Sequence, residues 1–187
     1  MYFPAPLDDD PDRAAALVHL DEDSRCAVQT LAHGSPIYPV VAILAGPRPR
    51  PLPDGRYYVH ITLAFPARRL MRNDGIARFT AATWKDIKAT LADLSRGGRV
   101  VILGMATTHP GYGSWLIGEE ASFMRGYLGQ PYQIVAVLDP HRCVGAFYGW
   151  TRDMSAQVQL GTPWLWRPGC PGTGGPGDVQ TYNGDLP

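Results

Sequence analysis

The chain reads Thr107-Thr108-His109-Pro110-Gly111-Tyr112-Gly113-Ser114-Trp115-Leu116-Ile117-Gly118-Glu119-Glu120 between a predicted buried strand and a predicted helix. The strand covers residues 99–106, an apolar run of strand length. The helix covers residues 118–128 and directs apolar side chains such as Phe123 and Met124 toward a core. The segment therefore brings polar and aromatic residues to the place where a strand ends and a helix begins.

Other helices and strands are predicted on both sides of this segment. The remaining predicted helices cover residues 13–20, 24–33 and 83–94. The remaining predicted strands cover residues 39–46, 57–65, 132–138 and 143–151. Ser24 and Thr83 are the expected helix caps, the second supported by Asp86. The alternation of strand and helix patterns predicts an α/β protein.

Composition favours a globular protein with one core. The chain has 187 residues, of which 45% are hydrophobic and 18% charged, so a single domain is expected. Seventeen basic and seventeen acidic residues cancel, which argues against binding to nucleic acid or to an anionic membrane. The N-terminus lacks the basic flank and apolar core of a secretion signal. We expect a cytoplasmic protein.

The ends of the chain differ in composition from its middle. We expect an N-terminal extension at 1–23, the folded domain at 24–163 and a Pro/Gly-rich tail at 164–187. Trp164 and Trp166 open that tail, and they either pack back on the domain or form a contact surface. The proline-rich stretch 47–55 is interpreted as a loop, with a groove-binding ligand as the alternative. Cys26, Cys143 and Cys170 form no Cys-x-x-Cys pair and are expected to be reduced.

The segment from Thr107 to Glu120 resembles the signature of the JAMM/MPN (JAB, Mov34/PAD-1-like) metallopeptidases. That signature reads His, Ser or Thr, His, Pro, six residues, Ser, two residues and Asp, often with Gly-Tyr-Gly-x-Trp-Leu inside it. The matching residues here are Thr108, His109, Pro110, Gly111, Tyr112, Gly113, Trp115 and Leu116. The similarity extends over about residues 24–151. It implies a single MPN/JAB-like, cytidine-deaminase-like domain with a central mixed β-sheet flanked by helices.

In this family the two histidines and the aspartate hold a catalytic zinc, and an upstream glutamate acts as general base. The present chain departs from that set. Thr107 occupies the first histidine position, and Ile117 occupies the serine position. His109 is kept, whereas Glu120 replaces the aspartate. Pro39 falls where the base glutamate is expected.

One histidine and one longer carboxylate are too few for a three-ligand zinc site. We therefore expect no catalytic residues, and no cofactor or metal; any residual metal would be held by His109 and Glu120. Both residues also have structural explanations, since His109 can end the strand and a carboxylate is favoured at a helix N-terminus. The resemblance then implies a scaffold or partner subunit, which would pair with an active JAMM-type protein, a ubiquitin-like protein or both. A homodimer is also compatible with it.

Two enzymatic alternatives remain open. A divergent zinc isopeptidase cleaving ubiquitin-like conjugates could recruit His60 or His141 in place of the missing ligand. A thiol hydrolase could instead pair one of the cysteines with a histidine. His60 by itself is more simply explained as a hydrogen-bonded or surface side chain of its predicted strand.

Overall fold

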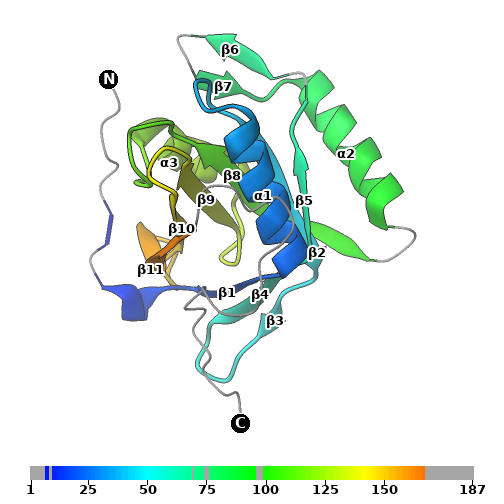
Figure 1. The fold of residues 1–187 in the computed structure, drawn as a ribbon. Coiled ribbons are helices and arrows are strands. Elements are labelled where there is room, and N and C mark those ends of the chain that lie inside the picture. Colours follow the sequence, from blue (N-terminus) through cyan, green and yellow to red (C-terminus); the bar gives the residue numbers. More distant parts are fainter. Residues whose placement is uncertain (1–6, 9, 69, 74–75, 96–98, 167–187) are drawn as a thin grey trace.

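The computed structural model describes residues 7–8, 10–68, 70–73, 76–95 and 99–166. Its centre is a mixed sheet of six strands in the spatial order β11-β10-β9-β8-β2-β5 (Figure 1). These strands are β2 (Val41–Pro47), β5 (Leu63–Pro66), β8 (Val100–Thr108), β9 (Ile134–Asp139), β10 (Val144–Trp150) and β11 (Gln157–Leu165). Neighbours are antiparallel except β8 and β9, which run parallel and are joined through the helix α3 (Gly118–Tyr127). The predicted α/β class with a central mixed sheet is confirmed.

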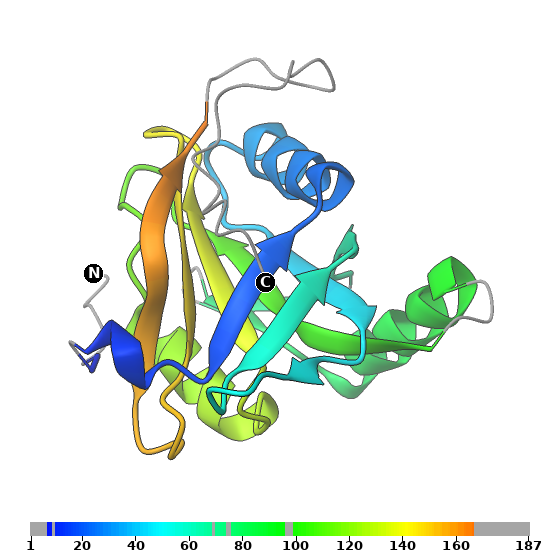
Figure 2. The same ribbon diagram turned by 90° about the horizontal axis from the view of Figure 1, so that it is seen from below.

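A smaller sheet and the other helices complete the fold. The small sheet has the order β1-β4-β3, with β1 (Ala16–Leu20), β4 (Tyr57–Ile61) and β3 (Arg50–Pro51). The strands β6 (Met71–Asn73) and β7 (Ile76–Arg78) form a separate hairpin, and Pro11–Arg13 forms a 3-10 turn. The remaining helices are α1 (Glu22–Gly34) and α2 (Ala81–Ser95). Figure 2 shows β1 and β4 side by side below α1.

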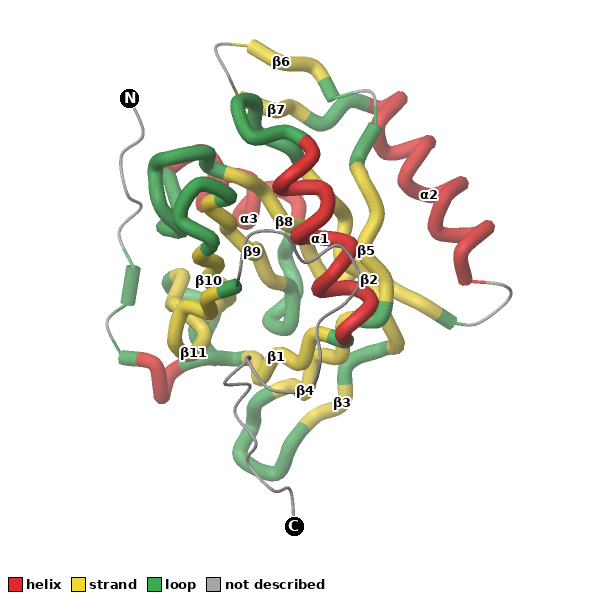
Figure 3. Tube along the Cα trace, in the orientation of Figure 1, coloured by secondary structure: helices red, strands yellow, loops and turns green. Residues whose placement is uncertain are grey.

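Alternating side chains of the central strands divide the core between two faces. Leu44 packs with Val28 of α1 and with residues of β1 and β4, whereas Ile43 packs with Ile87 of α2. On the second face, Met105 packs with Met124 of α3. Successive residues of a strand point to opposite faces, so one buried strand supplies both halves of the core. The central sheet is thus covered by α1 and the small sheet on one side and by α2 and α3 on the other (Figures 1 and 3).

The predicted helix at 13–20 is wrong, because this segment contains β1. Ala16 belongs to one core cluster, and the partly buried Val18 and Leu20 pack against the same cluster, which is the period-two pattern of a strand. β1 pairs in parallel with β4 from Ala16↔Tyr57 to Leu20↔Ile61. Parallel pairing with a distant strand satisfies the backbone hydrogen bonds of β1. Pairing with β4 therefore determines the secondary structure of residues 16–20, where local helix propensity gave the wrong prediction.

The predicted strand at 57–65 is divided at Thr62 between two sheets. β4 lies in the small sheet and β5 at the edge of the central sheet, while the Thr62 N–H donates to the Ala45 carbonyl at 3.0 Å. The chain crosses beside Gly46, where a Cβ atom would lie 2.1 Å from the His60 carbonyl oxygen. Alternation of side chains continues through such a crossing, so the sequence pattern did not reveal it.

Several predicted boundaries also moved. α1 begins at Glu22, so Ser24 is a buried helical residue and not its cap. α2 begins at Ala81, and Thr80 and Thr83 exchange hydrogen bonds of 3.1 Å between side-chain oxygen and backbone N–H. Thr83 is therefore the second half of a capping pair whose first half is Thr80. Within the proline-rich stretch, Arg50 and Pro51 pair with β4.

β11 was not predicted, although it forms an edge of the central sheet. Trp164 and Trp166 pack against the core on the face covered by α1, which confirms the interpretation that they fold back on the domain. Leu165 points away and is 68% exposed. The rest of the predicted tail, from residue 167 on, lies outside the described residues. Among the described helices, none is both long and apolar enough to cross a membrane.

Replacing Gly104 by alanine is expected to reduce the free energy of unfolding by more than about 3 kcal/mol. A Cβ atom at this position would lie 1.9 Å from the Ile134 carbonyl oxygen, so β8 and β9 could not stay paired. Urea denaturation measures the change. The matched control is Gly118→Ala, which meets nothing within 4 Å and should change stability by less than about 1 kcal/mol. Equal stability of the two variants would contradict the pairing described.

Candidate functional site

The motif segment leaves the central sheet at the end of β8. The Thr108 N–H donates to the Val40 carbonyl at 3.1 Å, and the Thr108 hydroxyl accepts from the Val40 N–H at 2.9 Å. On the other side, the His109 N–H donates to the Leu138 carbonyl at 2.7 Å. The threonine side chain therefore substitutes for a backbone group at the end of the ladder, and it holds His109 between β2 and β9.

The buried carboxylate of Asp139 organises the loop that follows. Its Oδ1 accepts from Gly111 N–H at 2.9 Å and its Oδ2 from Gly113 N–H at 2.7 Å. Oδ1 also accepts from the N–H groups of His141 at 2.9 Å and Arg142 at 3.3 Å. Burial alone would raise the pKa of Asp139, but these four backbone donors outweigh it and lower the pKa. One charged side chain thus ties the motif loop to the turn after β9.

Gly113 allows the loop to close over this carboxylate. Its φ of +90° lies in the left-handed region, and a Cβ atom would lie 2.7 Å from the Trp115 ring. The indole therefore rests on the glycine and leaves Trp115 47% exposed. Tyr112, at the tip of the loop, is 54% exposed.

His109 and Glu120 form a buried pair where the loop enters α3. Their side chains are 3% and 8% exposed, and Nε2 of His109 lies 2.8 Å from Oε1 of Glu120. The second carboxylate oxygen, Oε2, accepts from the Ile117 N–H at 3.0 Å, as in a capping box. Glu119, by contrast, is exposed. Both carboxylate oxygens of Glu120 consequently have protein partners, namely the His109 ring and the Ile117 N–H at the start of α3.

Tyr148 of β10 binds the backbone of the same loop. It is 2% exposed, and its hydroxyl donates to the Ser114 carbonyl at 2.8 Å. Burial raises the pKa of Tyr148 to about 12; the Leu116 N–H opposes this rise, and the Glu120 charge adds to it. The tyrosine therefore stays a neutral donor over the whole working pH range. Its role in the loop was not predicted.

The donor set around His109 does not fit the zinc site of the resembled family. Thr107 is buried at the end of β8 but offers only a neutral hydroxyl. Ile117 brings no oxygen beyond its backbone. Across the described residues, the one group of three or more His, Cys, Asp and Glu side chains close enough for a metal is His19, Asp21 and His60. His109 and Glu120 thus have no third protein ligand there.

The two histidines considered as replacements lie elsewhere. His60 Nε2 is 2.8 Å from Asp21 Oδ1, in the small sheet. His141 Nε2 donates to the Pro36 carbonyl at 2.7 Å, and its ring lies beside Gly111. His141 therefore links the loop before β2 to the motif loop and does not complete a metal site with His109.

The described cysteines do not provide an activated nucleophile. Burial raises the pKa of Cys26, and the neighbouring Glu22 charge adds to the rise. Burial likewise raises the pKa of Cys143, followed by the effect of Asp139. A catalytic thiol requires the opposite shift. Cys170 lies outside the described residues.

The exposed apolar side chains near the motif come from two loops that His141 connects. Ile37 is 74% and Tyr38 62% exposed in the loop before β2. Tyr112 and Trp115 are the half-exposed aromatics of the motif loop. Apolar and aromatic side chains gathered at one end of a sheet are typical of a protein contact surface. We call these four residues, of which three are aromatic and Ile37 is aliphatic, the aromatic rim.

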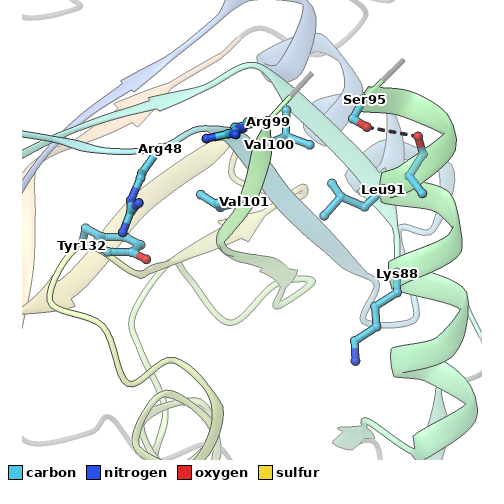
Figure 4. Close-up of a pocket in the computed structure, with 9 residues that line it drawn as sticks. Arg48, Lys88, Leu91, Ser95, Arg99, Val100, Val101 and Tyr132 are labelled. Atoms are coloured by element: carbon cyan, nitrogen blue, oxygen red, sulfur yellow. Dashed lines mark hydrogen bonds between the residues drawn. The ribbon is translucent and has the colours of Figure 1, made fainter. Parts of the chain in front are cut away.

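A basic hollow lies at the opposite end of β8 (Figure 4). Arg48, Lys88 and Arg99 line it together with Val100, Val101 and Tyr132, and its volume is about 570 Å³. His109 follows the last residue of β8, which at about 3.3 Å per residue places it on the order of 30 Å from Val100. The hollow is therefore separate from the motif segment.

No protein family model and no curated protein matches this sequence. Among solved structures, the chain is similar to the solution structure of protein DSY2949 from Desulfitobacterium hafniense, with a TM-score of 0.54 and 14% identity. The match covers 76% of this chain and 89% of that one. A solution structure from Salinibacter ruber matches with a TM-score of 0.48 and 16% identity, over 80% and 91% of the two chains. At such identities the first likeness shows a shared α/β fold and nothing about activity.

Replacing Asp139 by asparagine is expected to lower the free energy of unfolding by about 3 kcal/mol. The amide has one acceptor oxygen, and its NH₂ group would face backbone donors that now bind a carboxylate. Urea denaturation at neutral pH measures the effect. Asp93→Asn, an exposed change of the same chemistry on α2, is the control and should be nearly neutral. A loss no larger than that of the control would contradict the anchoring role.

The contribution of Asp139 should also depend on pH. Because the folded-state pKa is lowered, its stabilisation is fully present above the unfolded value of about 4 and is lost as the pH falls through the folded pKa. The stability difference between the wild type and Asp139→Asn should therefore be constant from about pH 5 to 7 and shrink below about pH 4. Urea titrations at several pH values test this. A difference that grew on acidification would contradict the sign of the shift.

Proposed function

We propose that this chain is a non-catalytic MPN/JAB-like module that acts as a scaffold or partner subunit. The observation that carries the proposal is the closed His109–Glu120 pair, in which the carboxylate binds the imidazole with one oxygen and the Ile117 N–H with the other. Such a carboxylate stabilises the entry to α3 and the position of the motif loop. His109 and Glu120 thus have a structural role at the positions where the resembled family binds zinc.

The surrounding residues support a module without hydrolytic chemistry. Ile117 stands at the serine position of the motif and offers no hydroxyl for a charged oxygen intermediate. Thr107 stands at the first histidine position, and Pro39 at the position expected for the base. A zinc-dependent hydrolase needs three protein ligands, an open water position and a general base. Only one histidine and one carboxylate of that set are present.

The aromatic rim supports a binding role. Ile37, Tyr38, Tyr112 and Trp115 expose apolar surface from loops that are fixed by Asp139 and His141. A rigid rim loses little conformational entropy when a partner covers it. The resemblance points to an active JAMM-type subunit or a ubiquitin-like protein as that partner. A homodimer through the same surface is the simplest competing arrangement.

The alternative function is a divergent zinc isopeptidase acting on ubiquitin-like conjugates. It is favoured by one observation, the 2.8 Å approach of His109 to Glu120, which brings two of the three ligand positions together. No third ligand lies beside this pair among the described residues, so the alternative takes its third ligand from a bound partner. In that case zinc would bind only in the complex, and His109→Ala would abolish both the metal and the cleavage.

The double variant Ile37→Ser with Tyr112→Ser is expected to weaken binding to a JAMM-type subunit or ubiquitin-like protein by at least about tenfold. Both side chains are more than half exposed, so the fold should be retained. Calorimetric titration measures the dissociation constant. The control is Leu94→Ser, an exposed apolar residue of α2 that should leave binding unchanged.

Hydrolysis is measured with the same proteins and a ubiquitin-like conjugate. The chain alone should give no cleavage above background, and His109→Ala should not alter the cleavage rate of an active partner. The proposal fails if the wild-type chain cleaves the conjugate and His109→Ala does not. It also fails if neither class of partner binds and the protein is monomeric at all concentrations tested.

A further inference from the structure

We propose that His19, Asp21 and His60 form a divalent transition-metal site, with zinc as the ion, on the surface of the small sheet. These residues lie away from the motif segment, and the inference does not depend on the proposed function. Their ligand atoms all lie within 4.8 Å of one another. Two imidazoles and one carboxylate are a common donor set for zinc and for related divalent ions.

The topology brings the three side chains together. β1 and β4 run parallel in register, so that His19 stands directly opposite His60. Their rings are 4.9 Å apart between centroids and meet edge to face. Residues in register on neighbouring strands point to the same side of the sheet. A helix at residues 13–20, as predicted from the sequence, would not place His19 opposite His60. The two residues face each other only because β1 pairs with β4.

The backbone also fixes the carboxylate. Asp21 follows β1 directly, and its N–H donates to the Ile61 carbonyl at 3.0 Å. It is the residue before α1, but its side chain makes no capping bond to the helix. Instead Oδ1 lies 2.8 Å from Nε2 of His60. A metal would replace this one hydrogen bond by two coordinate bonds and would add a third from His19.

Only small movements are needed for coordination. Tetrahedral zinc with bonds of about 2.0–2.1 Å places its ligand atoms about 3.3 Å apart. The His60 and Asp21 atoms are slightly closer than this, and His19 is exposed and able to change its rotamer. The same exposure leaves a fourth position open to water. The site would tie the N-terminal segment to β4 and to the start of α1.

The charges near the site favour a cation. Glu22 and Asp23 follow Asp21 in the first turn of α1. The nearest basic residue of that helix, Arg25, is already paired with Glu22. Arg50 is the opposing charge, since its guanidinium lies 5.2 Å above the Tyr58 ring, which in turn stacks on His19. The Arg50 guanidinium is thus held against the Tyr58 ring, and this ring separates it from the His19 imidazole.

The site lies near the other end of the central sheet from His109. The His60 carbonyl overlies Gly46, which pairs with Val101 at the start of β8. His109 follows the last residue of the same strand. Variants at one position should therefore leave the other undisturbed, which allows the two sites to be tested separately.

The test uses tag-free, metal-stripped protein and zinc alone as the probe. Equilibrium dialysis with elemental analysis should give about one zinc ion per chain, and excess zinc should raise Tm by about 5 °C or more. Both effects should be lost in His19→Ala and in Asp21→Asn. The matched control is Asp23→Asn, an exposed carboxylate two residues away, which should keep both. Cobalt should give the visible absorption of a tetrahedral nitrogen and oxygen site, and this should disappear with His19→Ala.

Because His19 is exposed, its substitution should leave the fold intact, which circular dichroism checks. Failure of the wild-type protein to bind zinc at saturating concentration would overturn the assignment. So would stoichiometric zinc retained by a folded His19→Ala protein. Zinc that is kept by His19→Ala and lost in His109→Ala would overturn the assignment and the proposed function together.

Discussion

The motif loop depends on one buried carboxylate. Asp139 accepts hydrogen bonds from two glycines of that loop and from two residues of the turn after β9. Because β8 and β9 are parallel neighbours, their ends lie at the same edge of the sheet, and a single side chain can reach both connections. Without this carboxylate, backbone N–H groups of both connections would lose their acceptor. The position of His109 relative to α3 follows from this constraint.

The same constraint fixes the shape of the loop through groups other than His109 and Glu120. The glycine N–H groups bind Asp139, and the Tyr148 hydroxyl binds the Ser114 carbonyl, so the loop is held through its backbone. His109 and Glu120 then bind each other in the buried space between the loop and α3. Under the proposed function, Thr107 and Ile117 stand at positions where the family has two polar side chains of its site. A binding role for the exposed aromatic rim is compatible with all of these features.

Sequence patterns predicted the elements that have a strong local signal. The apolar runs that became β2, β8 and β9 and the amphipathic helix α2 were all placed within a few residues. β1 was missed because its pairing with β4 is not local, and the division of 57–65 was missed because alternation continues across a change of sheet. The motif spacing predicted that His109 and Glu120 belong to the same site, and the two side chains lie within hydrogen-bond distance. The anchoring role of Asp139 was not predicted, because its hydrogen bonds join segments far apart in the sequence. The contact between His19 and His60 was missed because residues 13–20 were predicted as a helix.

The most direct measurement of the central claim is a crystal structure of zinc-soaked protein with anomalous data collected at the zinc absorption edge. The account predicts no anomalous peak within bonding distance of His109 Nε2, with Glu120 still bonded to the imidazole and to the Ile117 N–H. A strong peak beside His109 with a water molecule in an open coordination position would contradict it.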